Sequence, residues 1–579
     1  MANHRGTVER PTNDQGDLAG SASPKRSLVL ADAGAILASL LVLLVVHPVG
    51  SVLTSPYWLD EAWVALSSRA PLAALPTTTA STPLGWTFLV WMLPAHGQIH
   101  RLIAYAFLTA SVIAGYGFAR TLGWPGRVPA LLAGLTAAAA VTLLPAQQLR
   151  HDLKQYTADA AVALVLLALS ARLEPSPESR SSPESGPPEA RSSPVSRSAG
   201  EAAPAGEAAP AGEAASKRGS PFRAAGLAGA VTVGMLFSHP AALVGVAVLG
   251  GPFVVAVLGR RWRRLPGLLV EAAPAVVAMG AVYLLADGAA RNRAMVDYWA
   301  GYFPRPGELP RYLIERADQL RPAIGLPWPL YVLLFAAGVV TLVRLGRPAT
   351  AAAVVTLPVV AVVAGVGRVY PLLDLRTSHF LLVTGAVTVA VGLVGTVTAA
   401  TRLSARAPRP VVAGLRVVFV AAAVAGFAAA NRGRLDRAVP PGDARENVRA
   451  QVRYVAAHRR PGDAILVNLS GQYGFGYYWS ADRPEFVKGG VQATGWYVRY
   501  PPGRRIVIAA GRDPASVAAA LARARGLVTG GGRLWLVRSH VNADESRAWR
   551  EALAGEAVRS VAVGVEPVAL ITPPAPTRP

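Results

Sequence analysis

The sequence predicts a polytopic α-helical membrane protein, with a small α/β domain at its C-terminal end. Of the 579 residues, 52% are hydrophobic and only 16% are charged, and the mean hydropathy is +0.36. The apolar residues form runs of roughly 18 to 22, the length that a helix needs to cross about 30 Å of hydrocarbon. Beyond about Asn431 these runs give way to short helix-like and strand-like segments, which predicts a separate folded domain.

The composition also limits the chemistry. The chain has no cysteine, which excludes disulfides, thiolate catalysis and cysteine-based zinc or iron–sulfur sites. The formal net charge of +23 would indicate nucleic acid as the partner of a soluble protein. Here much of it follows from the rule that cytoplasmic loops carry Lys and Arg, so no nucleic-acid partner is expected. Catalysis must come from carboxylates, His, Lys, Arg and hydroxyl groups.

The first span is expected at Leu28–Val46, after a basic tail of residues 1–27 that should stay in the cytoplasm. The run is too long for the core of a signal peptide, so we expect it to be retained. The next apolar piece, 83–94, decides the topology. With about 12 residues it is shorter than a span, and its Trp86 and Trp91 favour an interfacial helix over a crossing one.

Eleven spans are then expected, and their odd number sends the C-terminal domain to the outer side. The predicted cytoplasmic segments hold 22 Lys and Arg against 12 in the outer loops, which supports this orientation. Heavy use of Ala, Gly, Pro and Arg indicates a GC-rich bacterial coding sequence, and hence a plasma membrane. The spans are 28–46, 101–120, 128–145, 157–172, 223–238, 241–258, 265–286, 327–343, 349–367, 378–399 and 411–429.

Two further regions complete the predicted organisation. Segment 174–222 is rich in Pro, Ser, Glu and Ala and repeats a hexad between Gly200 and Ala211, so it is expected to be a disordered cytoplasmic linker. It separates an N-terminal membrane region, 28–173, from a second group of helices, 223–430. In 431–579, alternation favours a mainly parallel sheet. Helices are expected at 446–459, 514–525 and 543–554, and strands at 464–469, 505–510, 534–539 and 561–571.

An acidic pair, Asp60 and Glu61, follows the first span among aromatic residues. Ionisable groups near the outer ends of spans are expensive and usually functional. Because successive helical residues point about 100° apart, one of the two can act while the other positions it. The alternative is that the pair only stabilises a helix N-terminus.

Three later outer loops supply cations. Arg150 and Lys154 lie four residues apart and could present one cationic patch to phosphate, or else they snorkel to the interface. Arg368 and Arg376 lie in the loop before the predicted span 378–399, and an Arg-rich, aromatic loop between spans seven and eight also favours an anionic partner. Further polar residues at these loop ends are Asp159, at the mouth of an apolar run, His379, and His239, which is more often a structural cap.

Together these residues suit a reaction on a lipid-linked phosphate. The lipid tail would lie between spans, the cations would bind the phosphate, and a carboxylate would take a proton from the incoming hydroxyl. Arg offers a bidentate fork for a phosphate leaving group. Aromatic side chains could stack on a sugar ring, although aromatic belts at the interface are a competing explanation. The candidate sugar contacts are Tyr57, Trp58, Trp63, Tyr156, His239 and His379.

The motifs resemble those of the GT-C glycosyltransferases, in particular protein O-mannosyltransferases and the lipid A aminoarabinose transferase. The Asp60–Glu61 pair resembles the acidic pair of their first external loop. Segment 82–86 (Thr-Pro-Leu-Gly-Trp) and segment 150–159 are similar to their next two motifs, with Ala158 where those have Pro. The stretches 370–380 and 460–463 resemble the corresponding stretches of bacterial members of this family.

The resemblance implies a GT-C fold and an inverting hexosyl- or pentosyltransferase that uses a polyprenyl-phosphate sugar on the outer face of the membrane. By motif position, Asp60 would be the base, Glu61 its neighbour in the pair and Asp159 the acid of the second loop. The acceptor would be a cell-envelope glycan, lipid or protein. Some GT-C enzymes use a divalent metal and others do not. Asp60 and Asp159 are the only obvious pair of ligands here, and this pair alone does not predict a bound metal.

Two other classes stay open at this point. Membrane charges also line the paths of transporters and flippases, although this sequence shows no inverted repeat and no paired broken helices. The helices could also be a non-catalytic anchor for the C-terminal domain. The sequence favours the transferase because its charges gather at outer loop ends.

Overall fold

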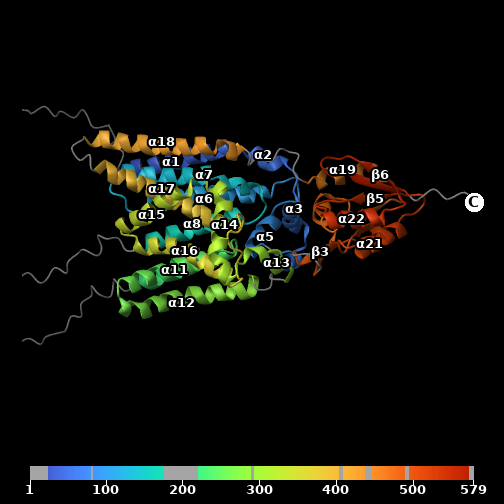
Figure 1. Cartoon of the computed structure of the whole chain (residues 1–579), viewed down its shortest axis with the longest axis horizontal. Helices are drawn as coiled ribbons and strands as arrows, with labels where there is room; N and C mark the ends of the chain where they lie inside the picture. The colour runs from blue at the N-terminus through green and yellow to red at the C-terminus, as the bar shows by residue number, and fades with distance from the viewer. Residues whose placement is uncertain are drawn as a thin grey trace, which may run out of the picture.

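The computed structural model describes residues 24–79, 82–174, 219–287, 293–402, 408–436, 446–489 and 494–572. A bundle of long helices forms one part of the molecule and a small α/β domain the other, with α2 (Val49–Thr54), α3 (Leu59–Leu66) and α5 (Leu84–Met92) between them (Figure 1). This arrangement confirms the predicted fold class. Most of the predicted cytoplasmic tail and nearly all of the predicted linker lie outside the described residues.

Apart from the helix Leu309–Ile324, which lies in a predicted outer loop, the bundle is built from helices that match the predicted apolar runs. They form because each run is long, apolar and bounded by Arg, Gly or Pro. The helices are α1 (Pro24–Val46), α6 (Arg101–Arg120), α7 (Arg127–Leu143), α8 (Tyr156–Leu173), α10 (Gly219–Met235), α11 (Ala241–Leu258), α12 (Leu265–Val282), α14 (Leu309–Ile324), α15 (Trp328–Arg344), α16 (Pro348–Val366), α17 (His379–Arg402) and α18 (Arg409–Asp436).

The predicted count of eleven spans is not confirmed. Among the described residues, eight helices are long and apolar enough to cross a membrane, and a ninth span results if α14 and α15 count as one, bent by 83°. The helix at 127–143 and the described apolar stretch at 225–235 are shorter. Helix α5 has nine residues, too few to span, which agrees with a segment that does not cross.

Helix α17 lies at the centre of the bundle, because 72% of its most apolar 18-residue stretch is buried. The same share is only 11%, 11% and 6% in α1, α12 and α18, which are peripheral. Small residues let the central helices approach closely. A Cβ atom at Gly392 of α17 would lie 2.0 Å from the carbonyl oxygen of Leu334 in α15. No larger residue fits there without moving one of the two helices.

The α/β domain is less parallel than predicted. Its main sheet has the order β4-β1-β5-β7-β6, in which β4, β1 and β5 are parallel but β7 and β6 join antiparallel. The predicted strand 561–571 begins at the last residue of one strand, 557–561, and continues into a second, 568–572, through a turn in which Gly564 adopts a positive φ of 76°. The strands are β1 (Ala464–Val467), β4 (Ile506–Ile508), β5 (Leu534–Val537), β6 (Ala557–Val561) and β7 (Val568–Thr572), with a separate hairpin of β2 (Glu485–Lys488) and β3 (Trp496–Arg499).

Three of the domain's helices correspond to predicted ones: α19 (Val448–His458), α21 (Pro514–Gly526) and α22 (Ala543–Ala552). A fourth, α20 (Gln472–Tyr478), was not predicted. It contains Gly474 and Gly476 and packs against the region of α3. One apolar cluster runs through α3, α5, α19, α20 and the sheet, so the domain and this end of the bundle share a core. We call this end of the bundle the α3 end.

Candidate functional site

Helix α3 carries the acidic pair at its first turn, where carboxylates interact favourably with the helix dipole. The two side chains lie in different surroundings, as their 100° separation requires. The side chain of Asp60 is 23% exposed, whereas that of Glu61 is 1% exposed. Only Asp60 is open to a substrate.

Glu61 is held in a buried ion pair. Its Oε1 accepts a hydrogen bond from Arg101 Nε at 2.6 Å, and its Oε2 accepts one from Arg101 Nη2 at 2.5 Å. The backbone N–H of Leu153 also donates to Oε1, at 3.1 Å. Burial raises the pKa of Glu61, while Arg101 and these hydrogen bonds oppose the shift. Glu61 thus ties α3 to α6 and to the loop before α8.

Asp60 meets a cation from the loop before α17. Its Oδ2 lies 3.5 Å from Nη1 of Arg376. The guanidinium also lies 3.3 Å from Asp374 Oδ1 and 5.3 Å from the ring centroid of Trp299, and it donates to the Tyr298 hydroxyl at 3.4 Å. Arg376, like Asp60, keeps 23% of its side chain exposed, so both partners of this ion pair are partly accessible.

Lys154 supplies a second cation from the loop before α8. Its side chain is 6% exposed, and Nζ lies 4.0 Å from the ring centroid of Trp63 in α3. Burial lowers the pKa of Lys154 to about 8, helped by the positive charge of Arg376 and opposed by Asp60 and Asp152. Lys154 therefore lies within electrostatic reach of Asp60 and Arg376.

Asp152 belongs to the same cluster. Burial, together with the negative charges of Glu61 and Asp60, raises the pKa of Asp152 to about 7, while Arg376 and Arg101 lower it. A carboxyl group that titrates near neutral pH beside a second carboxylate is typical of functional sites. The start of helix α3 and two loops thus bring acids and cations together at the α3 end: 58–63, 152–156 and 374–376.

Three predicted polar residues lie at or near the ends of the spans. Asp159, in α8, is 1% exposed, and neither of its carboxylate oxygens has a hydrogen-bond partner within the described residues. It lies within electrostatic reach of the half-buried His239. His379 begins α17 and is fully buried, with neither ring nitrogen hydrogen-bonded within the described ranges. Their roles stay predictions.

The aromatic candidates differ in exposure. Trp58 is half-buried beside Asp60, and Tyr156 is buried within reach of the charges of Arg376 and Asp60. Tyr57 is fully buried and packs against Tyr477 and Tyr478 of the α/β domain, at centroid distances of 5.2 and 6.4 Å. Its burial does not favour the predicted sugar contact.

Two predicted cations do not join the cluster in the described contacts. Arg368 is exposed and lies over the ring of Phe303 at 5.9 Å. The side chain of Arg150 lies outside what the structure describes. Of the phosphate-binding candidates, Lys154 and Arg376 are therefore the two placed beside Asp60.

Four site residues were not proposed from the sequence: Arg101, Asp152, Asp374 and Trp299. Asp152 and Asp374 lie in loops that the sequence did single out, within two residues of Lys154 and Arg376. The charge of Arg101 at the start of a span was a usable signal, because a buried cation there requires a buried acid. No group of three or more His, Asp or Glu side chains able to hold a metal occurs in the described part of the chain.

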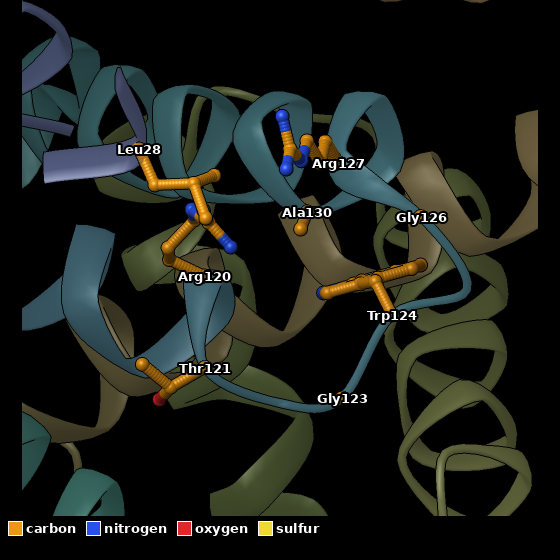
Figure 2. A pocket seen from close by; sticks show the side chains of 8 residues that line it. All are labelled: Leu28, Arg120, Thr121, Gly123, Trp124, Gly126, Arg127 and Ala130. Carbon is orange, nitrogen blue, oxygen red and sulfur yellow. The ribbon is translucent and has the colours of Figure 1, made fainter. Parts of the chain in front are cut away.

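The opposite end of the bundle carries cations without this convergence. A cavity of about 360 Å³ lies at the turn between α6 and α7, between Arg120, Arg127 and Trp124 (Figure 2). Arg120 is already paired there with Asp32, at 2.7 Å between Nε and Oδ1. None of the residues that line this cavity belongs to the acidic pair or its partners.

The fold and site define a membrane protein in which an acid and two cations lie where the α/β domain packs on the helix bundle. Comparisons with known proteins find similar structures but no similar sequences. No protein-family profile and no curated protein matches the chain. Solved structures of ArnT from Cupriavidus metallidurans are similar, in the apo state with 16% identity and a TM-score of 0.48, and bound to undecaprenyl phosphate with 14% and 0.46. Each covers 95% of this chain and 98% of the ArnT chain.

AglB, the oligosaccharyltransferase from Archaeoglobus fulgidus, is also similar, in a complex with an inhibitory peptide and a dolichol-phosphate. It has 10% identity and a TM-score of 0.44, over 87% of this chain and 69% of AglB. With TM-scores below 0.5, the chemistry must be argued from this chain's own residues.

Proposed function

We propose that the protein is a glycosyltransferase that moves a sugar from a polyprenyl-phosphate donor to a hydroxyl group of a cell-envelope glycan, lipid or protein. The reaction takes place at the α3 end, which faces the outside of the plasma membrane. The observation that carries the proposal is a partly exposed carboxylate, Asp60, 3.5 Å from Arg376 and within electrostatic reach of Lys154. A base at the start of helix α3 and two cations from two loops share one site.

The chemistry follows from the charges. Asp60 accepts the proton of the acceptor hydroxyl while the hydroxyl oxygen attacks the anomeric carbon of the donor sugar. The bond between that carbon and the phosphate oxygen breaks, and its electron pair goes to the phosphate. Arg376 and Lys154 stabilise the added negative charge, which is greatest as the bond breaks. Attack from the side opposite the phosphate inverts the anomeric configuration.

Asp60 suits the role of base better than its neighbour does. Glu61 spends both carboxylate oxygens on Arg101, Leu153 and the backbone of Trp58. A proton taken up by Glu61 would leave Arg101 buried without its counter-charge, at a cost of several kcal/mol. Asp60 has no such constraint, because its ion pair with Arg376 is partly exposed.

The variant Asp60→Asn tests the proposal. In membranes or detergent, it should transfer sugar from a polyprenyl-phosphate donor at least about 10³-fold more slowly than the wild type, because the base is lost. Asp318→Asn is the matched control. Asp318 also lies 3.5 Å from an arginine, Arg321, but on an exposed helix face, and its variant should keep full activity.

The outcomes separate the three functional classes. Transfer or donor hydrolysis that persists in Asp60→Asn would contradict the assignment of the base. If the wild type translocates lipid but transfers no sugar, and Asp60→Asn loses the translocation, the result would indicate a transporter. No transfer and no translocation by the wild-type chain would leave the membrane anchor as the function.

A further inference from the structure

The segment that carries Asp60 is held by the α/β domain at its amino end. The backbone N–H of Leu59, the residue before Asp60, donates to Oε2 of Glu446 at 2.9 Å. The N–H of Tyr57 donates to the hydroxyl of Tyr478 at 2.8 Å. The first turn of any helix has N–H groups without intrahelical partners, and an acidic acceptor there also interacts favourably with the dipole. Here that acceptor comes from another domain.

The same domain holds the other end of α3. Arg69, just beyond the helix, donates from Nη1 to the carbonyl oxygens of Gly476 at 2.6 Å and Trp479 at 2.5 Å. These carbonyls lie at the C-terminal end of α20, where a cation is favourable. A Cβ at Gly476 would lie 3.0 Å from Cδ2 of Leu66, so the glycine permits α20 to approach α3 this closely.

Glu446 is itself fixed by a histidine. His540 follows β5, and its Nδ1 lies 2.5 Å from Oε1 of Glu446. The backbone N–H of His540 donates to Glu566 at 3.0 Å, and its φ of +54° places it in the left-handed region. Glu446 therefore uses one oxygen on α3 and the other on His540. Its side chain is 8% exposed, whereas that of His540 is 46% exposed.

We propose that Glu446 and His540 are positioning residues for Asp60: the C-terminal domain caps helix α3 and thereby sets where the carboxylate lies relative to Arg376. The inference rests on the proposed function, because it gives Asp60 its catalytic meaning. It also assigns a task to a domain whose sequence revealed none. A displacement of about 1 Å at a reacting group can cost about 10²-fold in rate, so the cap need not touch the substrate to matter.

The cap has a pH dependence with a definite sign. The charged groups that face His540 are Glu446, Glu566, Arg512 and Asp60. Its hydrogen bond with Glu446 raises the pKa of His540 above 6.5, against the effects of burial and Arg512. The ion pair is therefore complete below the raised pKa, and it is lost as the pH rises through that value. Positioning of α3 weakens on the alkaline side.

The experiment compares Glu446→Ala with the wild type in the full-length chain, using two readouts. Hydrogen exchange of residues 59–66, measured without substrate, should become at least about tenfold faster, because the cap is removed. The kcat for transfer should fall about tenfold while the KM for the donor changes less than about twofold. Glu446→Gln, whose amide oxygen can still accept from Leu59, should recover part of the kcat. In His540→Gln, the decline of kcat at alkaline pH that is attributed to His540 should be absent.

Glu556→Ala is the matched control. Glu556 pairs with Arg525, which lies in the same domain and outside the α3 segment. Unchanged exchange at 59–66 together with unchanged kcat in Glu446→Ala would overturn the proposal. So would an equal rise of exchange in the Glu556→Ala control.

A second variant covers the case in which Glu446→Ala does not fold. Tyr478→Phe removes only the hydroxyl that accepts from Tyr57, and it should speed exchange at 57–61 and lower kcat about threefold; no change in either would overturn the proposal. The proposed function fails separately. If even the wild type transfers no sugar, that failure counts against the transferase, while the exchange readout still decides whether the domain caps α3.

Discussion

The two faces of helix α3 carry adjacent carboxylates in opposite circumstances. On one face Glu61 is buried at 1% exposure and bound by two nitrogens of Arg101. On the other, Asp60 is 23% exposed and meets Arg376 at 3.5 Å. Glu61 has both carboxylate oxygens bound within the protein, whereas Asp60 is available to a substrate. A pair that reads as a unit in the sequence therefore divides into a structural and a chemical residue.

The largest expected effect tests the buried face. Glu61→Gln should lower the free energy of unfolding by about 3–5 kcal/mol, because it leaves the charge of Arg101 buried without its partner. Asp60→Asn should change it by about 1 kcal/mol or less, since an exposed ion pair contributes little. Thermal unfolding of both variants in the same detergent measures the difference. Equal unfolding free energies of the two variants would contradict the assignment of a structural role to Glu61 and a chemical role to Asp60.

The next effect concerns the partner of the exposed face. Arg376→Gln should lower kcat/KM for transfer about 10²-fold, because the leaving phosphate loses a charged donor. The fold should be kept, since the side chain is partly exposed. Arg321→Gln, at an exposed ion pair on α14, is the control. A variant at 376 that is as active as this control would remove the cation from the mechanism.

A pH titration sharpens the role of the second cation. The pKa of Lys154 is about 8, so the side chain is cationic below pH 8 and loses its charge as the pH rises through that value. The KM for the donor should increase about tenfold between pH 7 and pH 9, because about 10% of the side chains stay protonated one unit above the pKa. Lys154→Arg should show a flat profile over this range. A wild-type KM that is flat from pH 7 to 9 would contradict the role.

The smallest effect is expected at the far end of the bundle. Asp32→Asn breaks the pair with Arg120, whose side chains are 34% and 21% exposed. It should cost about 1 kcal/mol or less and change the transfer rate less than about twofold. The same transfer assay and unfolding measurement apply. A large loss of transfer would show that the chemistry is not confined to the α3 end.

Hydropathy predicted the helices well because apolar length is a local property of the sequence. The boundaries that failed depend on particular residues. Helix α14 was not predicted, because its charged residues hide it from hydropathy and it lay in a predicted outer loop. It ends at Gly325, which has a positive φ of 75°, and Pro327 precedes α15, so the predicted span 327–343 follows a second helix at a bend of 83°. In the C-terminal domain the predicted strand 561–571 begins at the last residue of β6 and passes through the turn at Gly564 into β7. The pairing of β7 with β6 and β5 makes half of the strand pairs in the sheet antiparallel.

The site was predictable only in part, for a related reason. Asp60, Lys154 and Arg376 could be selected because charges at the ends of spans are costly. Their partners could not, since pairing depends on the tertiary fold. Arg101 is 40 residues from Glu61, and Glu446 is 387 residues from Leu59. No local pattern reveals a hydrogen bond over such a distance.

That separation of 387 residues has a consequence for biosynthesis. The ribosome completes α3 early, but Glu446 and Tyr478 emerge only after the whole bundle has been made. A nascent chain can therefore insert its helices while the first turn of α3 still awaits its acceptors. A chain that ended before residue 446 would lack these acceptors and the domain's share of the common core, so the reaction centre depends on translation of the last part of the chain.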